Sequence, residues 1–152
     1  MKKIGDLGEK LVGRWLQLHN YKILKRNWRC RWGEIDLIVQ HPASSAIAFV
    51  EVKTRSARNW DADGLLAVNA GKQQKLIQTA SLFLTKHPYL AELPCSFDIA
   101  VVTYQSLDPA GNLCWQTIGE AIERLERLEA RQLVVIKGCE LKIEHYLAAA
   151  FD

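Results

Sequence analysis

The chain has 152 residues, 49% of them hydrophobic, so it is long enough for one domain with a substantial core and too short for two ordinary ones. Its formal net charge is +3, from 20 basic and 17 acidic residues. No run approaches the roughly 20 apolar residues of a membrane helix, and the start lacks the apolar segment of a secretory signal. We therefore expect a cytoplasmic protein without a membrane partner.

Apolar periodicity predicts the elements in chain order. They are a helix from Asp6 to about His19, strands at 21–30, 32–40 and 46–55, a helix at 69–86, a strand at 96–104 and a hairpin at 133–145. The segment at about 107–132 is predicted to be an insertion. The pattern indicates a single α/β domain over residues 1–152, with a central mixed sheet and helices on both faces.

The helix at 69–86 has an apolar and a polar side. We expect the apolar side to face the sheet and the polar side to face solvent. The residues expected inside are Leu76, Ile77, Ala80, Phe83 and Leu84, and those expected outside are Lys72, Lys75 and Thr79.

The four cysteines show no pairing pattern. Cys30, Cys95, Cys114 and Cys139 are far apart, form no C-x-x-C pair and keep no regular spacing to histidine. This argues against a structural zinc site, and we expect reduced, buried thiols.

The charge is unevenly distributed along the chain. Residues 1–58 contain 12 lysine or arginine residues and 5 acidic ones, whereas residues 59–152 contain 8 and 12. Phosphate contacts supply most non-specific affinity for nucleic acid, so a basic half is typical of a polyanion-binding surface. A solvated charged face has the same composition, and both interpretations are open at this point.

Three charged residues lie in strands that otherwise look buried: Asp36 in the strand at 32–40, and Glu51 and Lys53 on one face of the next. Burying an ion costs several kcal/mol unless it is paired or bound to a metal. Carboxylates on neighbouring strands can converge on a hard cation such as Mg²⁺ or Mn²⁺. Lys53 is then placed to hold a water molecule or neutralise phosphate charge. The structural alternative is a salt bridge between Asp36 and Lys53.

Basic residues around these strands are candidates for phosphate contacts. They are Arg26, Arg29 and Arg31 at the first strand, Arg55 and Arg58 after the Glu-x-Lys strand, and Lys72 in the first turn of the second helix. Trp28 and Trp32 are able to stack on bases, but a tryptophan in a strand more often belongs to the core. We expect Asn27 and Gly33 to shape turns.

Several motifs carry a resemblance to known families. Asp36 followed by Glu51-Val52-Lys53 resembles the signature of the PD-(D/E)XK nuclease superfamily. The wider set resembles the YraN-like family of predicted endonucleases, related to archaeal Holliday junction resolvases. It comprises Gly5-x-x-Gly8-Glu9, Arg26-Asn27-Trp28-Arg29, Gly33-Glu34-Ile35-Asp36-Leu37-Ile38 and Phe49-Val50-Glu51-Val52-Lys53-Thr54-Arg55. The resemblance covers residues 4 to about 104.

The resemblance implies a three-layer α/β/α, restriction endonuclease-like core and a metal bound by Asp36, Glu51 and the carbonyl of Val52. It also implies that Glu9 joins the metal site. From the residues alone, Glu9 equally fits a capping box that begins at Asp6. Where the family has Arg-Phe-Asp, this chain has Ser96-Phe97-Asp98, so we expect Asp98 to be structural.

The sequence therefore predicts a metal-dependent nuclease that hydrolyses phosphodiester bonds of nucleic acid. DNA, branched or single-stranded, is the expected substrate, Mg²⁺ or Mn²⁺ the expected cofactor, and a homodimer is what a junction resolvase would form. Two alternatives are open. One is a non-catalytic nucleic-acid-binding or accessory module with a nuclease fold, and the other is a protein-interaction domain using a helix at 119–131.

Overall fold

The structure is a computed structural model of the whole chain, and it describes residues 2–56, 70–106, 133–136 and 139–146. Its elements are α1 (Lys2–Leu18), β1 (Lys22–Cys30), β2 (Gly33–Gln40), β3 (Ile47–Ser56), α3 (Ala70–Lys86), the short 3-10 helix η2 (Pro88–Leu90), β4 (Cys95–Ser106), β5 (Leu133–Ile136) and β6 (Cys139–Tyr146). The predicted α/β class and order of elements are confirmed. The predicted insertion at 107–132 lies outside the described residues.

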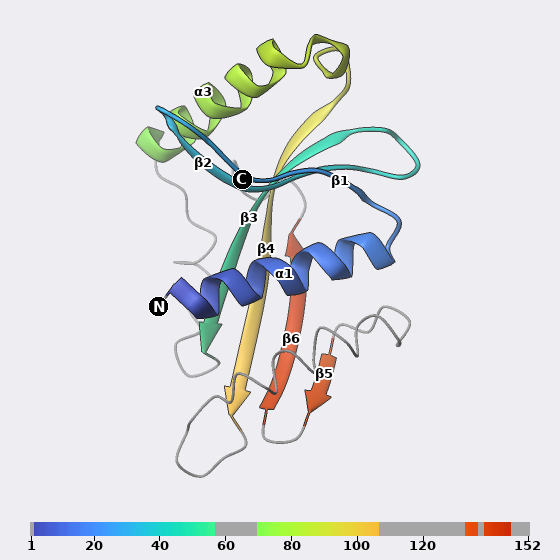
Figure 1. Cartoon of the computed structure of the whole chain (residues 1–152), viewed down its shortest axis with the longest axis vertical. Coiled ribbons are helices and arrows are strands. Elements are labelled where there is room, and N and C mark those ends of the chain that lie inside the picture. The colour runs from blue at the N-terminus through green and yellow to red at the C-terminus, as the bar shows by residue number, and fades with distance from the viewer. Residues whose placement is uncertain (1, 57–69, 107–132, 137–138, 147–152) are drawn as a thin grey trace.

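The strands form one mixed sheet. Its six strands are ordered β1-β2-β3-β4-β6-β5 (Figure 1). Only the pairing of β3 with β4 is parallel among the described strands, and α3 lies between these two strands in the chain. Strands β2, β3 and β4 therefore occupy the middle of the sheet, and β1 is one of its edges.

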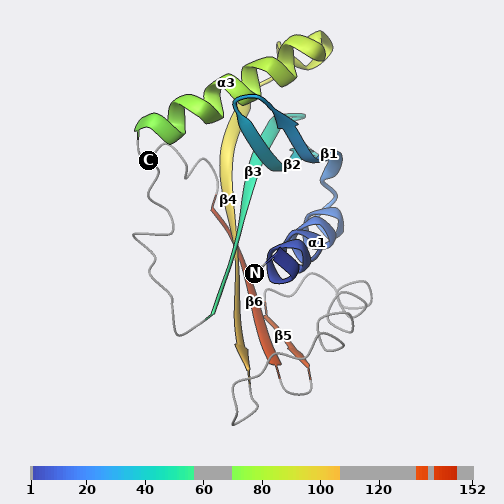
Figure 2. The same ribbon diagram turned by 60° about the vertical axis from the view of Figure 1, so that its left-hand side comes forward.

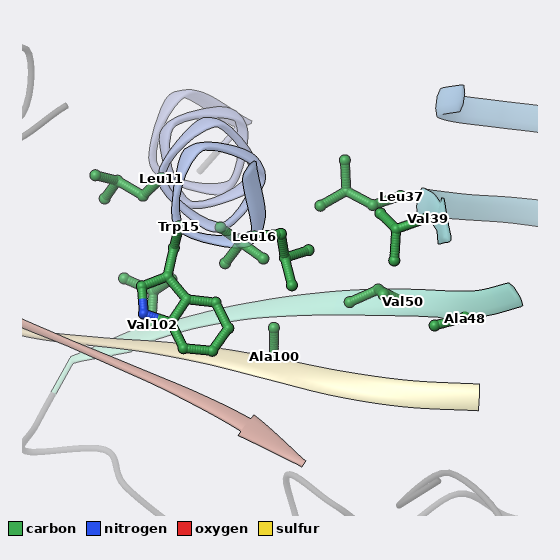
Figure 3. Close-up of a cluster of buried hydrophobic side chains, with 10 residues drawn as sticks. Leu11, Trp15, Leu16, Leu37, Val39, Ala48, Val50, Ala100 and Val102 are labelled. Carbon is green, nitrogen blue, oxygen red and sulfur yellow. The ribbon is translucent and has the colours of Figure 1, made fainter. Parts of the chain in front are cut away.

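Helix α1 covers one face of the sheet. Its apolar stripe, including Leu11, Trp15 and Leu16, packs against Val50 and Ala100 in a buried cluster (Figure 3). Each fully buried side chain of this size contributes roughly 1.5 to 3 kcal/mol of hydrophobic stabilisation. Packing against the sheet thus holds α1 in place, and with it the polar residues on the flank of the helix.

Helix α3 covers the other face (Figure 2). Ala80 and Phe83 pack against Ile38 and Phe49 in a second cluster. Neighbouring β2 residues show the alternation, because Leu37 belongs to the α1 cluster and Ile38 to the α3 cluster.

Two side chains of α3 face the opposite way from the prediction. Ile77 is 48% exposed, and Thr79 is buried. The Thr79 hydroxyl donates to the Lys75 carbonyl at 2.7 Å, which satisfies the buried group without water.

The predicted burial of the cysteines is wrong for the two whose side chains the structure describes. Cys30 is half-buried and Cys95 is exposed, and both are free thiols.

No helix within the described residues has the length and apolar composition needed to span a membrane.

Strands β2 and β3 separate halfway along their length. Their pairing runs from Gln40 opposite Ile47 to Leu37 opposite Val50. Beyond this point β2 continues beside β1, while β3 continues beside β4. The next residues in each direction, Asp36 and Glu51, therefore stand where the two strands part.

Gly8 is required for the close approach of α1 to β3. A Cβ atom at Gly8 would overlap the side chain of Thr54, whereas a Cβ atom at Gly5 would meet nothing within 4 Å. We expect Gly8→Ala to lower the free energy of unfolding by about 1 to 3 kcal/mol. Gly5→Ala should raise it by up to about 1 kcal/mol, because alanine favours the helix. Urea denaturation followed by circular dichroism checks this, and equal stabilities would contradict the packing.

Candidate functional site

The side chain of Asp36 lies in the opening between β2 and β3. Its side chain is half-buried, and Oδ2 accepts a hydrogen bond from the backbone N–H of Val52 at 2.8 Å. The carboxylate therefore takes the place of the backbone acceptor that a paired β2 would have supplied. Because the N–H and C=O of one strand residue point to the same neighbour, the carbonyl of Val52 also faces this opening.

Glu51 is surrounded by amines. Its Oε1 lies 3.6 Å from Nζ of Lys53 and 3.3 Å from Nζ of Lys72, which reaches across from α3. Its Oε2 is buried and has no hydrogen-bond partner among the described residues. Lys53 thus pairs with Glu51 and not with Asp36, and one oxygen of Glu51 is left for another ligand.

A cavity on the α3 side joins these residues. Its volume is about 100 Å³, which is enough for several water molecules. Asp36, Glu51 and Lys72 line it, together with Glu34 and Asp98. Asp98, which we expect to be structural, is buried and accepts a hydrogen bond from Oγ of Ser96 at 2.8 Å.

Glu9 reaches Asp36 from the α1 side. Helix α1 begins at Lys2, so Asp6 lies inside the helix and the capping-box interpretation of Glu9 is wrong. Burial, followed by the charge of Asp36 and a hydrogen bond to that carboxyl group, raises the pKa of Glu9 to about 7. Burial also raises the pKa of Asp36, with a further contribution from the charge of Glu51 and against the effect of the Val52 N–H. Burial and the neighbouring acids therefore favour the protonated form of both carboxyl groups.

Asn27 is a site residue that the sequence did not reveal. We predicted a turn there, but Asn27 lies within β1, in the left-handed conformation with φ 49°. With its amide nitrogen turned toward the acids, it donates to Glu9 at 2.9 Å and to Glu34 at 3.0 Å. The available signal was that asparagine tolerates a left-handed backbone and brings a short donor. The expected turn at Gly33 is confirmed, since Gly33 follows the β1–β2 connection with φ 154°.

The arginines that we predicted to bind phosphate lie in different environments. Arg26 lines a second cavity beside Glu9 and Asp36. Arg29 is bound to Glu34, with Nε 3.2 Å from the carboxylate. Arg31 lies 4.6 Å above the Trp32 ring, Arg55 donates to the neighbouring Thr54 carbonyl at 2.9 Å, and Arg58 lies outside the described residues.

Trp28 belongs to the core. Its ring packs edge-on against Phe83, with 5.5 Å between the ring centroids. The core interpretation of this tryptophan is confirmed.

The acids do not form a ready-made metal cage. Among the described histidine, cysteine and acidic side chains, no group of three or more is close enough to hold an ion. Asp36 and Glu51 share the cavity on the α3 side, and Glu9 approaches Asp36 from the α1 side. A bound ion would therefore use two carboxylates and a backbone carbonyl, with Glu9 drawn in directly or through water.

Comparison with known proteins assigns the chain to a family. Residues 8–102 match the model of the uncharacterised protein family UPF0102. The chain belongs to this family. It is the YraN-like family whose motifs the sequence carries, and the matched residues span α1 through most of β4, including every element that contributes to the site.

Relatives in cyanobacteria extend the match. The UPF0102 protein of Synechocystis sp. is 44% identical over 151 residues, covering 99% of both chains. That of Acaryochloris marina is 42% identical over 158 residues, covering 98% of this chain and 90% of its own. That of Trichormus variabilis is 51% identical over 105 residues, covering 67% of this chain and 70% of its own.

The raised pKa of Glu9 predicts a pH-dependent stability. Because the pKa is about 7 in the folded chain against an ordinary 4.5, folding favours the protonated acid. This stabilisation is present below about pH 4.5 and is lost as the pH rises through about 7. Melting temperatures measured in EDTA should therefore fall over this window. A divalent ion should reduce the fall, because it replaces the proton. Glu9→Gln should flatten the EDTA curve, and an unchanged slope in this variant would contradict the assignment.

Proposed function

We propose that this chain is a divalent-metal-dependent nuclease of the PD-(D/E)XK superfamily that hydrolyses phosphodiester bonds of DNA in the cytoplasm. The observation that carries the proposal is the opening between β2 and β3, where Asp36 and Glu51 line one cavity beside the amine of Lys53. One helix on each face of a mixed sheet is also compatible with the three-layer core of that superfamily.

The residues present fit a hard cation such as Mg²⁺ or Mn²⁺. The donor set is entirely oxygen, as these ions prefer. Oε2 of Glu51 is buried without a partner among the described residues, and burial and the charges of neighbouring acids disfavour ionisation of the Glu9 and Asp36 carboxyl groups. A cation would relieve both conditions. Asp36, Glu51 and the carbonyl of Val52 would hold it, with Glu9 as a further ligand.

Side-chain and backbone groups of the chain itself would meet the other requirements of phosphodiester hydrolysis. A bound divalent ion supplies an activated water and stabilises charge on the scissile phosphate. Lys53, whose side chain is only 10% exposed and whose Nζ lies 3.6 Å from Oε1 of Glu51, would orient the attacking water or offset the developing negative charge. The Val52 N–H holds Asp36 facing β3, so the two acids keep their separation before any substrate arrives.

A non-catalytic nucleic-acid-binding module is the alternative, and one observation favours it. Glu51 is already paired with Lys53 and Lys72, and no three ligands converge among the described side chains. An acid whose charge is satisfied by two amines has less need of a metal. In that case the chain would bind DNA through its basic surface and leave cleavage to another protein.

Cleavage and calorimetry separate these functions. Labelled single-stranded DNA, duplex DNA and a four-way junction are incubated with the purified chain in Mg²⁺, Mn²⁺ or EDTA. The nuclease proposal expects cleavage of at least one substrate with metal and none in EDTA. DNA binding without cleavage, together with no heat of Mn²⁺ binding, would instead establish the non-catalytic module.

A further inference from the structure

We propose that Arg26 and Lys10 form a subsite for a phosphodiester group of the nucleic-acid backbone. The guanidinium group of Arg26 lies against Gly13 of α1. The subsite lies on the α1 side of Asp36, across the sheet from the cavity that contains Glu51 and Lys72. This inference rests on the proposed function for its ligand, because it assumes that a nucleic acid approaches the acid cluster.

The subsite is a cavity of its own. Its volume is about 340 Å³, more than three times that of the cavity on the α3 side. It is lined by Asp6, Glu9, Lys10, Arg26, Asn27, Asp36 and Leu37. Asp36 lines both cavities. A nucleic-acid backbone that reaches Asp36 from the α1 side would therefore pass Lys10 and Arg26.

Gly13 provides the place where Arg26 lies. Gly13 is buried although it has no side chain, and a Cβ atom added to it would stand 2.5 Å from Nη1 of Arg26. The other two nearest atoms, Cζ and Nη2 at 3.3 Å, belong to the same guanidinium group. The group therefore rests against the helix backbone at Gly13, and a larger residue there would displace it from the helix.

Arg26 and Lys10 keep their charges available. Neither makes an ion pair with any residue that the structure describes. The other predicted phosphate contacts differ, because Arg29 is bound to Glu34 and Lys72 to Glu51. A guanidinium group that makes no ion pair with the described residues is suited to two parallel hydrogen bonds with a phosphate.

The acids of this cavity make phosphate binding conditional. Asp6, Glu9 and Asp36 repel an anion when their charge is not offset. A divalent ion bound by the cluster would offset this charge, and Arg26 would then bind the phosphate against less repulsion. The contribution of Arg26 to DNA affinity should therefore be larger with a divalent ion than in EDTA.

DNA binding by a set of matched variants tests the subsite. Fluorescence anisotropy with a labelled single-stranded oligonucleotide and its duplex is measured in Ca²⁺ and in EDTA, over a range of salt. We expect Arg26→Ala to weaken binding in Ca²⁺ about tenfold and to lower the salt slope by about 1. Gly13→Ala should weaken binding by a similar factor, and the double variant should be no weaker than Arg26→Ala alone, because both act on the same group.

Two controls separate this effect from loss of folding or of bulk charge. Gly5→Ala adds the same methyl group to the same helix where it meets nothing within 4 Å, so its DNA affinity should equal that of the parent. Lys25→Ala removes an exposed β1 charge that does not line the cavity, and its effect should be smaller than that of Arg26→Ala. Thermal melting should show Gly13→Ala folded, because only the end of a flexible side chain must move.

The outcomes are distinct. Parent-like binding by Gly13→Ala, or equal losses in Arg26→Ala and Lys25→Ala, would overturn the subsite while any metal-dependent cleavage by the parent leaves the nuclease proposal standing. The expected affinities in a chain that never cleaves would support the subsite and refute the nuclease. A parent that binds no DNA in either condition and does not cleave it with metal would overturn both.

Discussion

Asp36→Asn is expected to abolish metal-dependent cleavage, with a loss of at least about a thousandfold. The substitution removes the carboxylate charge that a divalent ion requires while the amide oxygen can still accept the Val52 N–H, so the fold should persist. Because burial already raises the pKa of Asp36, a neutral side chain should cost little or no stability. The measurements are initial rates of DNA cleavage and the free energy of unfolding of the same preparations.

A matched control accompanies this variant. Glu92→Gln removes one exposed carboxylate that lines neither cavity beside Asp36, and it should cleave at the parent rate. If Asp36→Asn cleaves as fast as the parent, the activity comes from a contaminating nuclease or from another part of the chain. Either result would remove Asp36 from the mechanism.

Lys53→Met should separate metal binding from catalysis. Methionine preserves much of the buried aliphatic part of the side chain. Loss of the amine removes a cation whose Nζ lies 3.6 Å from Oε1 of Glu51 and would compete there with a metal ion. We therefore expect Mn²⁺ binding to be retained or strengthened, while the cleavage rate at saturating DNA falls by about a hundredfold or more. Calorimetry reports the first quantity and single-turnover cleavage the second.

Lys75→Met serves as the control for this experiment. Lys75 is exposed on α3 and lines neither cavity beside Asp36, so this variant should match the parent in both measurements. Weaker Mn²⁺ binding by Lys53→Met would indicate that the lysine supports the carboxylates structurally. An unchanged cleavage rate would exclude it from the chemistry.

The sequence predicted the elements well because strong apolar periodicity marks them, and every predicted helix and strand within the described residues is present. It also indicated that Asp36 and Glu51 approach each other, because a hairpin brings adjacent strands together. It did not show that pairing ends at Leu37 and Val50, and this separation of strands creates the opening. The point where two strands separate depends on their contacts with the strands on either side, and the local pattern of a single strand does not reveal these contacts.

Other errors arose where tertiary contacts overrule local chemistry. Ile77 is exposed and Thr79 buried because the position of α3 on the sheet decides which stripe is covered, and a hydroxyl can satisfy itself within the helix. The role of Glu9 was ambiguous because Asp6 and Glu9 have the spacing of a capping box, whereas α1 begins one turn earlier, at Lys2. Asn27 was missed because its significance lies in partners from α1 and β2.

The most direct test is the position of a metal in crystals soaked with Mn²⁺ and measured by anomalous scattering. We predict an ion between β2 and β3, about 2.1 Å from carboxylate oxygens of both Asp36 and Glu51, with the carbonyl of Val52 at a similar distance. It should displace Lys72 from Glu51, where the two atoms now lie 3.3 Å apart. Mn²⁺ found only elsewhere, with Glu51 still bound to its two lysines at saturating metal, would contradict the assignment of this opening as a metal site.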